Sequence, residues 1–259
     1  EVWQSLSLLA EAMKIQFCQE LFETQGVSAA HEYMQRLYQE AEVTKVKATK
    51  NLVIDLDFKS AHYKITQLFE AQVEHPKFTK LLSLIQEEHK KCKKILIFNN
   101  FRDSAMKLKN ALNLIPGVKC QLFVGQTKKK GFGMSQKAQI QMLEDFKEEK
   151  FNVLVGTSVG EEGIDIPAVD LIIFYEPVPS AIRTVQRRGR TGRMEEGRVI
   201  VLVTKGTRDE AYRWTAHHKE NRMHRVLKDL KTKFTLQRPQ EQQSLQEFTL
   251  IQKSLSGLQ

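Results

Sequence analysis

Residues 153–167 read VLVGTSVGEEGIDIP, and residues 186–193 read QRRGRTGR. The first stretch opens with Val153–Val155, a short apolar run that predicts a buried strand. Thr157 and Ser158 follow at once, where the strand gives way to a turn or a helix. Free backbone N–H groups at such a strand end suit phosphate binding, so this stretch predicts an anion-binding loop.

Short apolar strands alternate with helices from Pro76 onward. This alternation predicts an α/β fold whose parallel sheet is covered by helices on both faces. In such a fold, ligands gather at the carboxyl ends of the strands. The strands are expected at Ile95–Phe98, Cys120–Val124, Val153–Val155, Leu171–Tyr175 and Val199–Val203, and the helices at Lys77–Lys91, Ser104–Leu114, Lys137–Glu149, about Ser180–Arg188 and Asp209–Leu230.

Residues 1–75 have helical periodicity and almost no glycine. A first helix is expected to end at Gln25-Gly26, and Ser28 is expected to cap a second helix that runs to about Ala41. Thr44–Asn51 is predicted to be an exposed connection. A third helix is predicted at about Lys59–Glu74. His75-Pro76 then ends the helical region, because the residue before a proline avoids the helical conformation.

Three parts are therefore predicted: a helical segment at 1–75, the α/β domain at 76–235, and a Gln-rich tail or linker at 236–259. The first residues, EVWQSLSLLAEAMK, read as the interior of a helix, so the chain is expected to be a fragment. No run of about 18 apolar residues occurs, and a membrane partner is not expected.

The chain carries 40 Lys and Arg against 31 Asp and Glu, a net charge of +9, which favours an anionic partner such as nucleic acid. Solvated lysines kept for solubility are the alternative. The three cysteines are widely spaced, so neither a disulfide framework nor a zinc site is predicted.

The arginine cluster is the strongest pointer to a ligand. Arg187, Arg190 and Arg193 recur at every third residue with glycines between them. Like charges this close repel unless they share an anion, and guanidinium groups match phosphate oxygens in pairs. An oligophosphate is therefore the expected occupant, and a solvated basic loop is the less favoured alternative.

Two other segments follow predicted strands. In FNNFRDSA, residues 98–105, Asn99 and Arg102 offer hydrogen-bond donors. A cap on the following helix would explain the presence of Asn100 with Asp103. It would not explain Arg102, for which a backbone phosphate is a candidate partner. In residues 156–170, Asp165 can accept hydrogen bonds from ribose hydroxyls or pair with an arginine, although a turn cap is the commoner role for such an aspartate. The lysine-rich stretch 125–139 fits a solvated loop and a nucleic-acid contact equally well.

The sequence lacks the motifs that hold the phosphates and Mg²⁺ in an ATP site. No G-x-x-x-x-G-K-[ST] sequence occurs, so the chain has no P-loop to hold nucleotide phosphates. Asp209-Glu210 resembles an acidic magnesium-binding box, but five residues separate it from the preceding strand. Thr207 and Glu210 instead fit a helix capping box, which predicts a structural role.

Together, FNNFRDSA, GTSVGEEGID and QRRGRTGR resemble motifs IV, V and VI of the second RecA-like domain of superfamily 2 helicases. EPVPSAIRTVQRRGRTGR, TKGTRDEAY and the segment FETQGVSAAHEYMQRLYQEAEVTKVKATK resemble the Hef, FANCM and Mph1 family of DNA helicases, including the helical insert that Hef carries between its motor domains. The resemblance covers about residues 1–235.

The resemblance implies roles for individual residues. Arg190 and Arg193 match the catalytic arginines that reach the γ-phosphate of ATP, and Gln186, Gly163 and Asp165 match positions at the nucleotide. Nucleic-acid contacts are predicted for Asn99, Arg102, Gly125, Gln126, Thr157 and Ser158, with no metal ligand in the chain. ATP and Mg²⁺ would bind only together with an N-terminal RecA-like domain of the same parent protein.

The implied function is that of an ATP-dependent DNA helicase or translocase acting on forks and junctions. This chain alone is expected not to hydrolyse ATP. The expected location is the cytoplasm of an archaeon, in association with the nucleoid. Two alternatives stay open at this point. One is an ATP-dependent RNA helicase, because the motifs contact mainly phosphates and sugars. The other is a nucleic-acid-binding module without catalysis.

Overall fold

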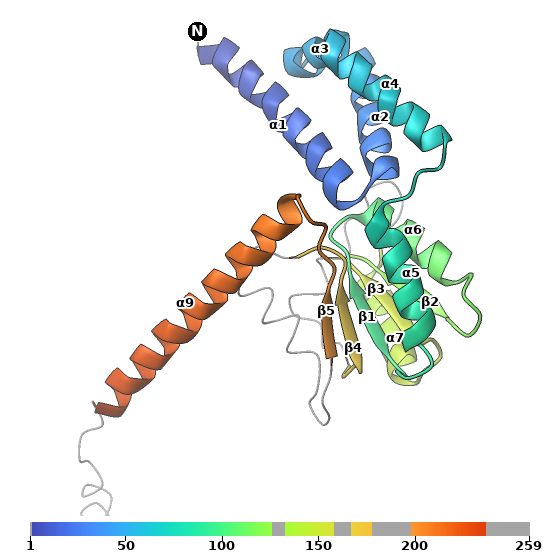
Figure 1. Cartoon of the computed structure of the whole chain (residues 1–259), viewed down its shortest axis with the longest axis vertical. Coiled ribbons are helices and arrows are strands. Elements are labelled where there is room, and N and C mark those ends of the chain that lie inside the picture. Colours follow the sequence, from blue (N-terminus) through green and yellow to red (C-terminus); the bar gives the residue numbers. More distant parts are fainter. Residues whose placement is uncertain (1, 126–132, 158–166, 178–197, 237–259) are drawn as a thin grey trace, which may run out of the picture. The chain divides into compact units, whose positions relative to one another are not determined.

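Five parallel strands form the sheet, in the order β2-β3-β1-β4-β5. They are β1 Ile95–Phe98, β2 Cys120–Phe123, β3 Val153–Gly156, β4 Leu171–Phe174 and β5 Arg198–Val201. The central strand β1 is buried along its whole length, and Phe98 at its end lies opposite Gly156 of β3 and Phe174 of β4. The carboxyl ends of neighbouring strands are therefore level (Figure 1).

The computed structural model describes residues 2–125, 133–157, 167–177 and 198–236. Its helices are α1 Val2–Thr24, α2 Val27–Val43, α3 Lys47–Ile54, α4 Leu56–Glu70, α5 Pro76–Glu88, α6 Arg102–Leu112, α7 Gln136–Lys147 and α9 Arg208–Leu236. The chain divides into two compact units, Glu1–Ala216 and His217–Gln259. No helix of the described ranges is long and apolar enough to cross a membrane.

The alternation of side chains along the strands builds two cores. Ile95 and Ile97 of β1 pack into one cluster with Leu81 of α5 and Leu108 of α6. The intervening side chains, such as Leu96, pack into a second cluster together with α7. Because both faces are covered, the strands read as continuous apolar runs, and the predicted RecA-like α/β fold with a preceding helical region is confirmed.

The helical region α1–α4 has its own core. Cys18, Leu21, Met34, Leu37, Leu52 and Phe58 are buried together in it. Phe17 of α1 meets Tyr33 of α2 edge to face, with 4.9 Å between the ring centroids. Phe101, which belongs to the α/β part of the chain, also packs against this core.

Two local predictions in the helical region are wrong. Thr44–Asn51 is not an exposed connection, because α3 begins at Lys47 and buries Ala48 and Leu52, which lie one turn apart on one face. Ser28 does not cap α2, which starts one residue earlier, after Gly26. The Ser28 hydroxyl instead accepts a hydrogen bond from Lys107 of α6 at 2.9 Å.

Candidate nucleotide and nucleic-acid site at the carboxyl edge of the sheet

The predicted site residues that the structure describes lie at one edge of the sheet. Asn99 follows β1, and its N–H donates to Gly156 O at 3.0 Å. Thr157 follows β3, and its N–H donates to Phe123 O at 3.1 Å. Gly125, two residues beyond β2, accepts a hydrogen bond from Met134 N–H at 3.2 Å. The carboxyl ends of three adjacent strands thus bring these three residues to the same side of the molecule.

The other predicted site residues lie outside the described residues. They are Gln126, Ser158, Gly163, Asp165, Gln186, Arg190 and Arg193. Segment 158–166 nevertheless starts directly after Thr157, and segment 178–197 starts four residues after the last residue of β4. The described residues that precede both segments therefore lie at the carboxyl edge, where ligands of doubly wound folds bind. The roles of the site residues outside the described ranges remain predictions.

Asn99 organises the turn that leads into α6. It is only 1% exposed, and its Oδ1 accepts the N–H of Phe101 at 2.8 Å. The predicted cap from Asn100 with Asp103 is wrong, because Phe101 occupies the cap position without a side-chain bond to the helix. Asp103 lies instead 3.7 Å from Arg36 of α2. Arg102 is the first residue of α6 and is half-buried.

A buried carboxylate joins the loops after β1 and β4. Glu176 accepts the backbone N–H of Asn100 with one oxygen and the amide of Gln25 with the other, at 3.3 Å. Burial raises the pKa of Glu176 to about 7, against the lowering effect of the Asn100 N–H, the Lys77 charge and Gln25. Neither Glu176 nor Gln25 is among the site residues predicted from the sequence, and the local signal for Glu176 is a glutamate near the end of an apolar strand.

The raised pKa of Glu176 predicts that the free energy of unfolding depends on pH. Because the pKa in the folded chain lies above the ordinary value of 4.5, the folded state holds the proton more tightly between pH 4.5 and about 7. The stabilisation is complete below pH 4.5 and is lost as the pH rises through 7, by about 3 kcal/mol in total.

Glu176→Gln is expected to remove this contribution. Urea unfolding of the chain and the variant, measured from pH 4.5 to 8, should show the variant gaining about 3 kcal/mol relative to the wild type over that range. If the free energies of unfolding of the two proteins change with pH in the same way, no carboxyl group titrates near pH 7 at this position.

Beside Glu176 lies an ion pair removed from solvent. Lys77 Nζ is 2.7 Å from Asp209 Oδ2, with side chains 5% and 0% exposed. Asp209 Oδ2 also accepts the N–H of Thr204 at 3.0 Å, and the ammonium lies 5.1 Å from the centre of the Tyr175 ring. Asp209 therefore fastens the start of α9 to the start of α5, which agrees with the predicted structural role.

The predicted capping box at the start of α9 is present in a shifted form. Thr207 Oγ1 accepts the N–H of Asp209 at 3.3 Å. Glu210 accepts the N–H of Gly206 at 3.0 Å rather than that of Thr207. In the described ranges, no three His, Cys, Asp or Glu side chains are grouped so that they could hold a metal ion.

The turn between α1 and α2 packs closely against His75, which directly precedes α5. Gly26 has a φ of +100°, and a Cβ there would lie 2.7 Å from Cβ of His75. His75 Nδ1 accepts the N–H of Lys77 at 3.1 Å, so Nε2 carries the proton and donates to Glu23 O at 3.0 Å. Burial lowers the pKa of His75, which favours this neutral form.

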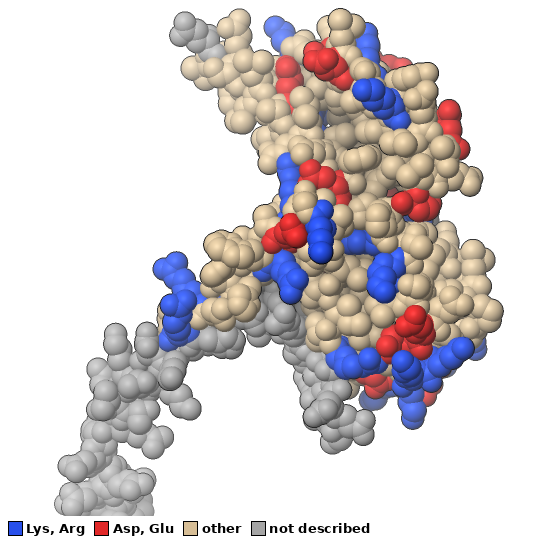
Figure 2. All heavy atoms as spheres, in the orientation of Figure 1, with Lys and Arg blue, Asp and Glu red and all other residues tan. Residues whose placement is uncertain are grey.

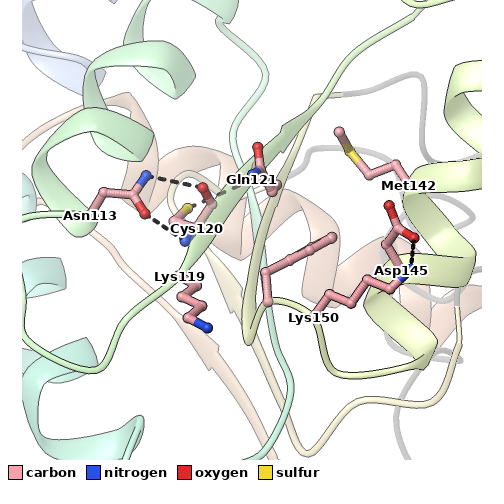
Figure 3. A pocket seen from close by; sticks show the side chains of 8 residues that line it. Asn113, Lys119, Cys120, Gln121, Met142, Asp145 and Lys150 are labelled. Atoms are coloured by element: carbon pink, nitrogen blue, oxygen red, sulfur yellow. Dashed lines mark hydrogen bonds and ion pairs between the residues drawn. The ribbon is translucent and has the colours of Figure 1, made fainter.

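A hollow of about 450 Å³ lies elsewhere, beside the edge strand β2 (Figure 3). Two of its lining residues are Lys119, which directly precedes β2, and Phe151, which lies two residues before β3. The hollow therefore opens at the amino ends of these strands. Asn113 fills the open side of β2: its Oδ1 accepts Cys120 N–H at 2.8 Å and its Nδ2 donates to Cys120 O at 3.0 Å. This hollow is not part of the candidate site.

Charge alone does not mark a path for nucleic acid over the one face of the described residues that is drawn (Figure 2). On the face drawn in Figure 2, basic and acidic side chains are interspersed. Several lysines are paired with carboxylates, for example Lys107 with Glu74 at 2.8 Å and Lys150 with Asp145 at 2.7 Å. The geometry of the strand ends, rather than a basic field, therefore defines the candidate site.

Comparison with known proteins agrees with this geometry. Residues 76–195 match the family model described as "Helicase conserved C-terminal domain", and residues 2–75 match the model described as "Putative ATP-dependent RNA helicase, helical bundle". The crystal structure of the Pyrococcus furiosus Hef helicase domain superposes with a TM-score of 0.65 and 46% identity, over 83% of this chain and 44% of that one.

Two relatives extend the comparison. "Putative ATP-dependent RNA helicase MJ1505" of Methanocaldococcus jannaschii is 44% identical over 88% of this chain and 28% of its own length. "ATP-dependent DNA helicase MPH1" of Pyricularia oryzae is 46% identical over 46% of this chain and 11% of its own length. The chain thus spans less than a third of either relative. It belongs to the Hef, FANCM and Mph1 family of superfamily 2 helicases and corresponds to their C-terminal RecA-like part with the preceding helical bundle.

Proposed function

We propose that the chain is the C-terminal motor half of an ATP-dependent DNA helicase or translocase that acts on branched DNA such as forks and junctions. The observation that carries the proposal is the shared edge of the sheet, which holds Asn99, Thr157 and the residues that follow β4, directly before the segment with the arginine motif in the sequence. This arrangement allows one edge to meet both a nucleotide and a nucleic-acid backbone.

The proposed ATP site needs a second domain. The sequence has no P-loop, so the phosphates and Mg²⁺ would be held by an N-terminal RecA-like domain, while Arg190 and Arg193 of this chain complete the site. Gln186, Gly163 and Asp165 would lie against the nucleotide, and Arg102 and Thr157 along the nucleic-acid backbone. Bound ATP supplies the phosphoryl group whose transfer to water drives the motor.

The first test is ATP hydrolysis. The purified chain is expected to release no phosphate from Mg²⁺-ATP, with or without fork DNA, because nothing in its sequence cradles the phosphates. A longer protein that adds the N-terminal motor domain is expected to hydrolyse ATP, and faster with DNA. Turnover by the chain alone, after contaminating ATPases are removed, would refute the division of labour proposed here.

DNA structure is the second variable to test. Binding of the longer protein to a fork, a four-way junction and a linear duplex should be compared at several salt concentrations, because phosphate contacts give a steep salt dependence for every substrate. Tighter binding of the fork and the junction at equal salt supports the branched-DNA assignment, whereas equal affinities contradict it.

A second candidate is an ATP-dependent RNA helicase. The name of the Methanocaldococcus jannaschii relative and the description of the helical-bundle family favour it. The name of the Pyricularia oryzae relative favours DNA. RNA and DNA forks of identical sequence, offered in the ATPase assay, separate the two candidates: stimulation by RNA alone would replace the DNA assignment.

A further inference from the structure

The three residues before Arg102 are each held by a contact from outside α6. The Asn99 amide donates to Gln25 Oε1 at 3.3 Å. The Asn100 N–H donates to Glu176. The Phe101 ring packs against the core of the helical region, with its centroid 6.2 Å from that of Phe17. The path of the chain into Arg102 is therefore fixed by the helical region and by the end of β4.

Gln25 is the centre of these contacts. It is 8% exposed, and it accepts from Asn99 while it donates to Glu176 at 3.3 Å and to Thr24 Oγ1 at 3.4 Å. One amide thus joins the loop after β1 to the loop after β4. No apolar side chain of the same size can replace both bonds, and a carboxylate would lie against Glu176.

The position of Gln25 is itself fixed. The N–H groups of Gln25 and Gly26 both donate to Leu21 O, at 2.8 and 2.9 Å, which closes the end of α1. Gly26 then packs on His75 with a backbone conformation that favours glycine. Gln25 is therefore a rigid support rather than a side chain that adapts to the loop.

From this geometry we infer that Gln25 is a positioning residue for nucleic-acid binding: it acts from the helical region, through Asn99 and Glu176, to set the place of Arg102 at the carboxyl edge of the sheet. The inference rests on the proposed contact between Arg102 and a nucleic-acid backbone. The helical region then contributes to binding at the sheet edge, whether or not it touches the nucleic acid itself.

The test uses the chain as it stands and a fluorescently labelled DNA fork, with affinity measured by anisotropy at several salt concentrations. Arg102→Ala is expected to weaken binding at least about fivefold and to reduce the salt slope by about one phosphate contact. Gln25→Leu is expected to weaken binding about threefold or more, with the same change in slope. The double variant should bind no more weakly than Arg102→Ala.

The matched control is Gln35→Leu. Gln35 also lies in the helical region, but its amide contacts His31 and His62, at 3.5 and 3.3 Å, and not the Asn99 turn. Its replacement is expected to leave the affinity and the salt slope unchanged. If Gln25→Leu does not fold, as judged by circular dichroism, Gln25→Met takes its place, because its unbranched side chain has a similar length.

The outcomes separate the two ideas. If the wild-type chain does not bind DNA, the same variants are measured in the longer protein with the N-terminal motor domain, and the proposed function fails if that protein does not bind DNA either. If Arg102→Ala weakens binding but the Gln25 variants do not, or if the two effects add fully, the positioning inference is overturned while the proposed function stands. If the chain binds DNA and Arg102→Ala changes nothing, the inference is overturned because Arg102 makes no contact for Gln25 to position.

Discussion

Asp209→Ala is expected to lower the free energy of unfolding by about 3–5 kcal/mol. The substitution leaves the ammonium of Lys77 buried without its carboxylate and removes the acceptor of the Thr204 N–H. A buried charge without a partner is costly, because the protein interior solvates it far less well than water does. Urea unfolding followed by circular dichroism measures the loss.

Two controls show whether burial causes the effect. Asp145→Ala breaks an ion pair with Lys150 that has the same 2.7 Å separation but is exposed, so the unfolding midpoint is expected to stay nearly unchanged. The double variant Lys77→Met and Asp209→Leu removes both buried charges and is expected to regain most of the lost stability. A small effect of Asp209→Ala would mean that water reaches the pair.

Arg190→Ala, in a protein that also carries the N-terminal motor domain, is expected to lower the rate of ATP hydrolysis by about 10³–10⁵-fold. The guanidinium is proposed to stabilise the charge that develops on the transferred phosphoryl group, and alanine supplies no charge there. Phosphate release under saturating DNA and ATP measures the change. Affinity for DNA should stay largely intact, because the arginine is proposed to face the nucleotide.

Arg213→Ala is the matched control for that experiment. Arg213 is an exposed arginine in the first turns of α9, within the same domain. Its replacement removes one positive charge without touching the arginine motif, so turnover should remain near the wild-type level. Wild-type turnover by Arg190→Ala would show that another residue supplies the catalytic charge.

The sheet could be predicted from the sequence because its strands are short apolar runs bounded by helices. Ile95–Phe98 is buried over its full length, and such a run reads as a strand without any knowledge of its neighbours. The helix α3 was missed because its lysines gave the segment a polar appearance, while the packing of Ala48 and Leu52 depends on α1 and α2.

The support of the candidate site could not be predicted in the same way. Gln25 and Glu176 lie 151 residues apart in the chain, and Lys77 and Asp209 lie 132 apart. Neither pair has a local pattern, because a single glutamine before a glycine is also what an ordinary turn contains. Motifs such as QRRGRTGR mark the residues expected to face ligands, whereas the residues that hold them in place become visible only when the chain is folded.

The amide of Asn113, which pairs with both backbone groups of Cys120, has a consequence for the behaviour of the protein in solution. An open sheet offers its outer strand as a template on which another molecule can add a strand and start aggregation. Asn113 occupies one end of that template, and Gln139 occupies the other by donating to Val124 O at 2.8 Å. Two neutral side chains thereby occupy backbone groups of Cys120 and Val124 that an added strand would need, at the edge where the sheet of the described strands ends.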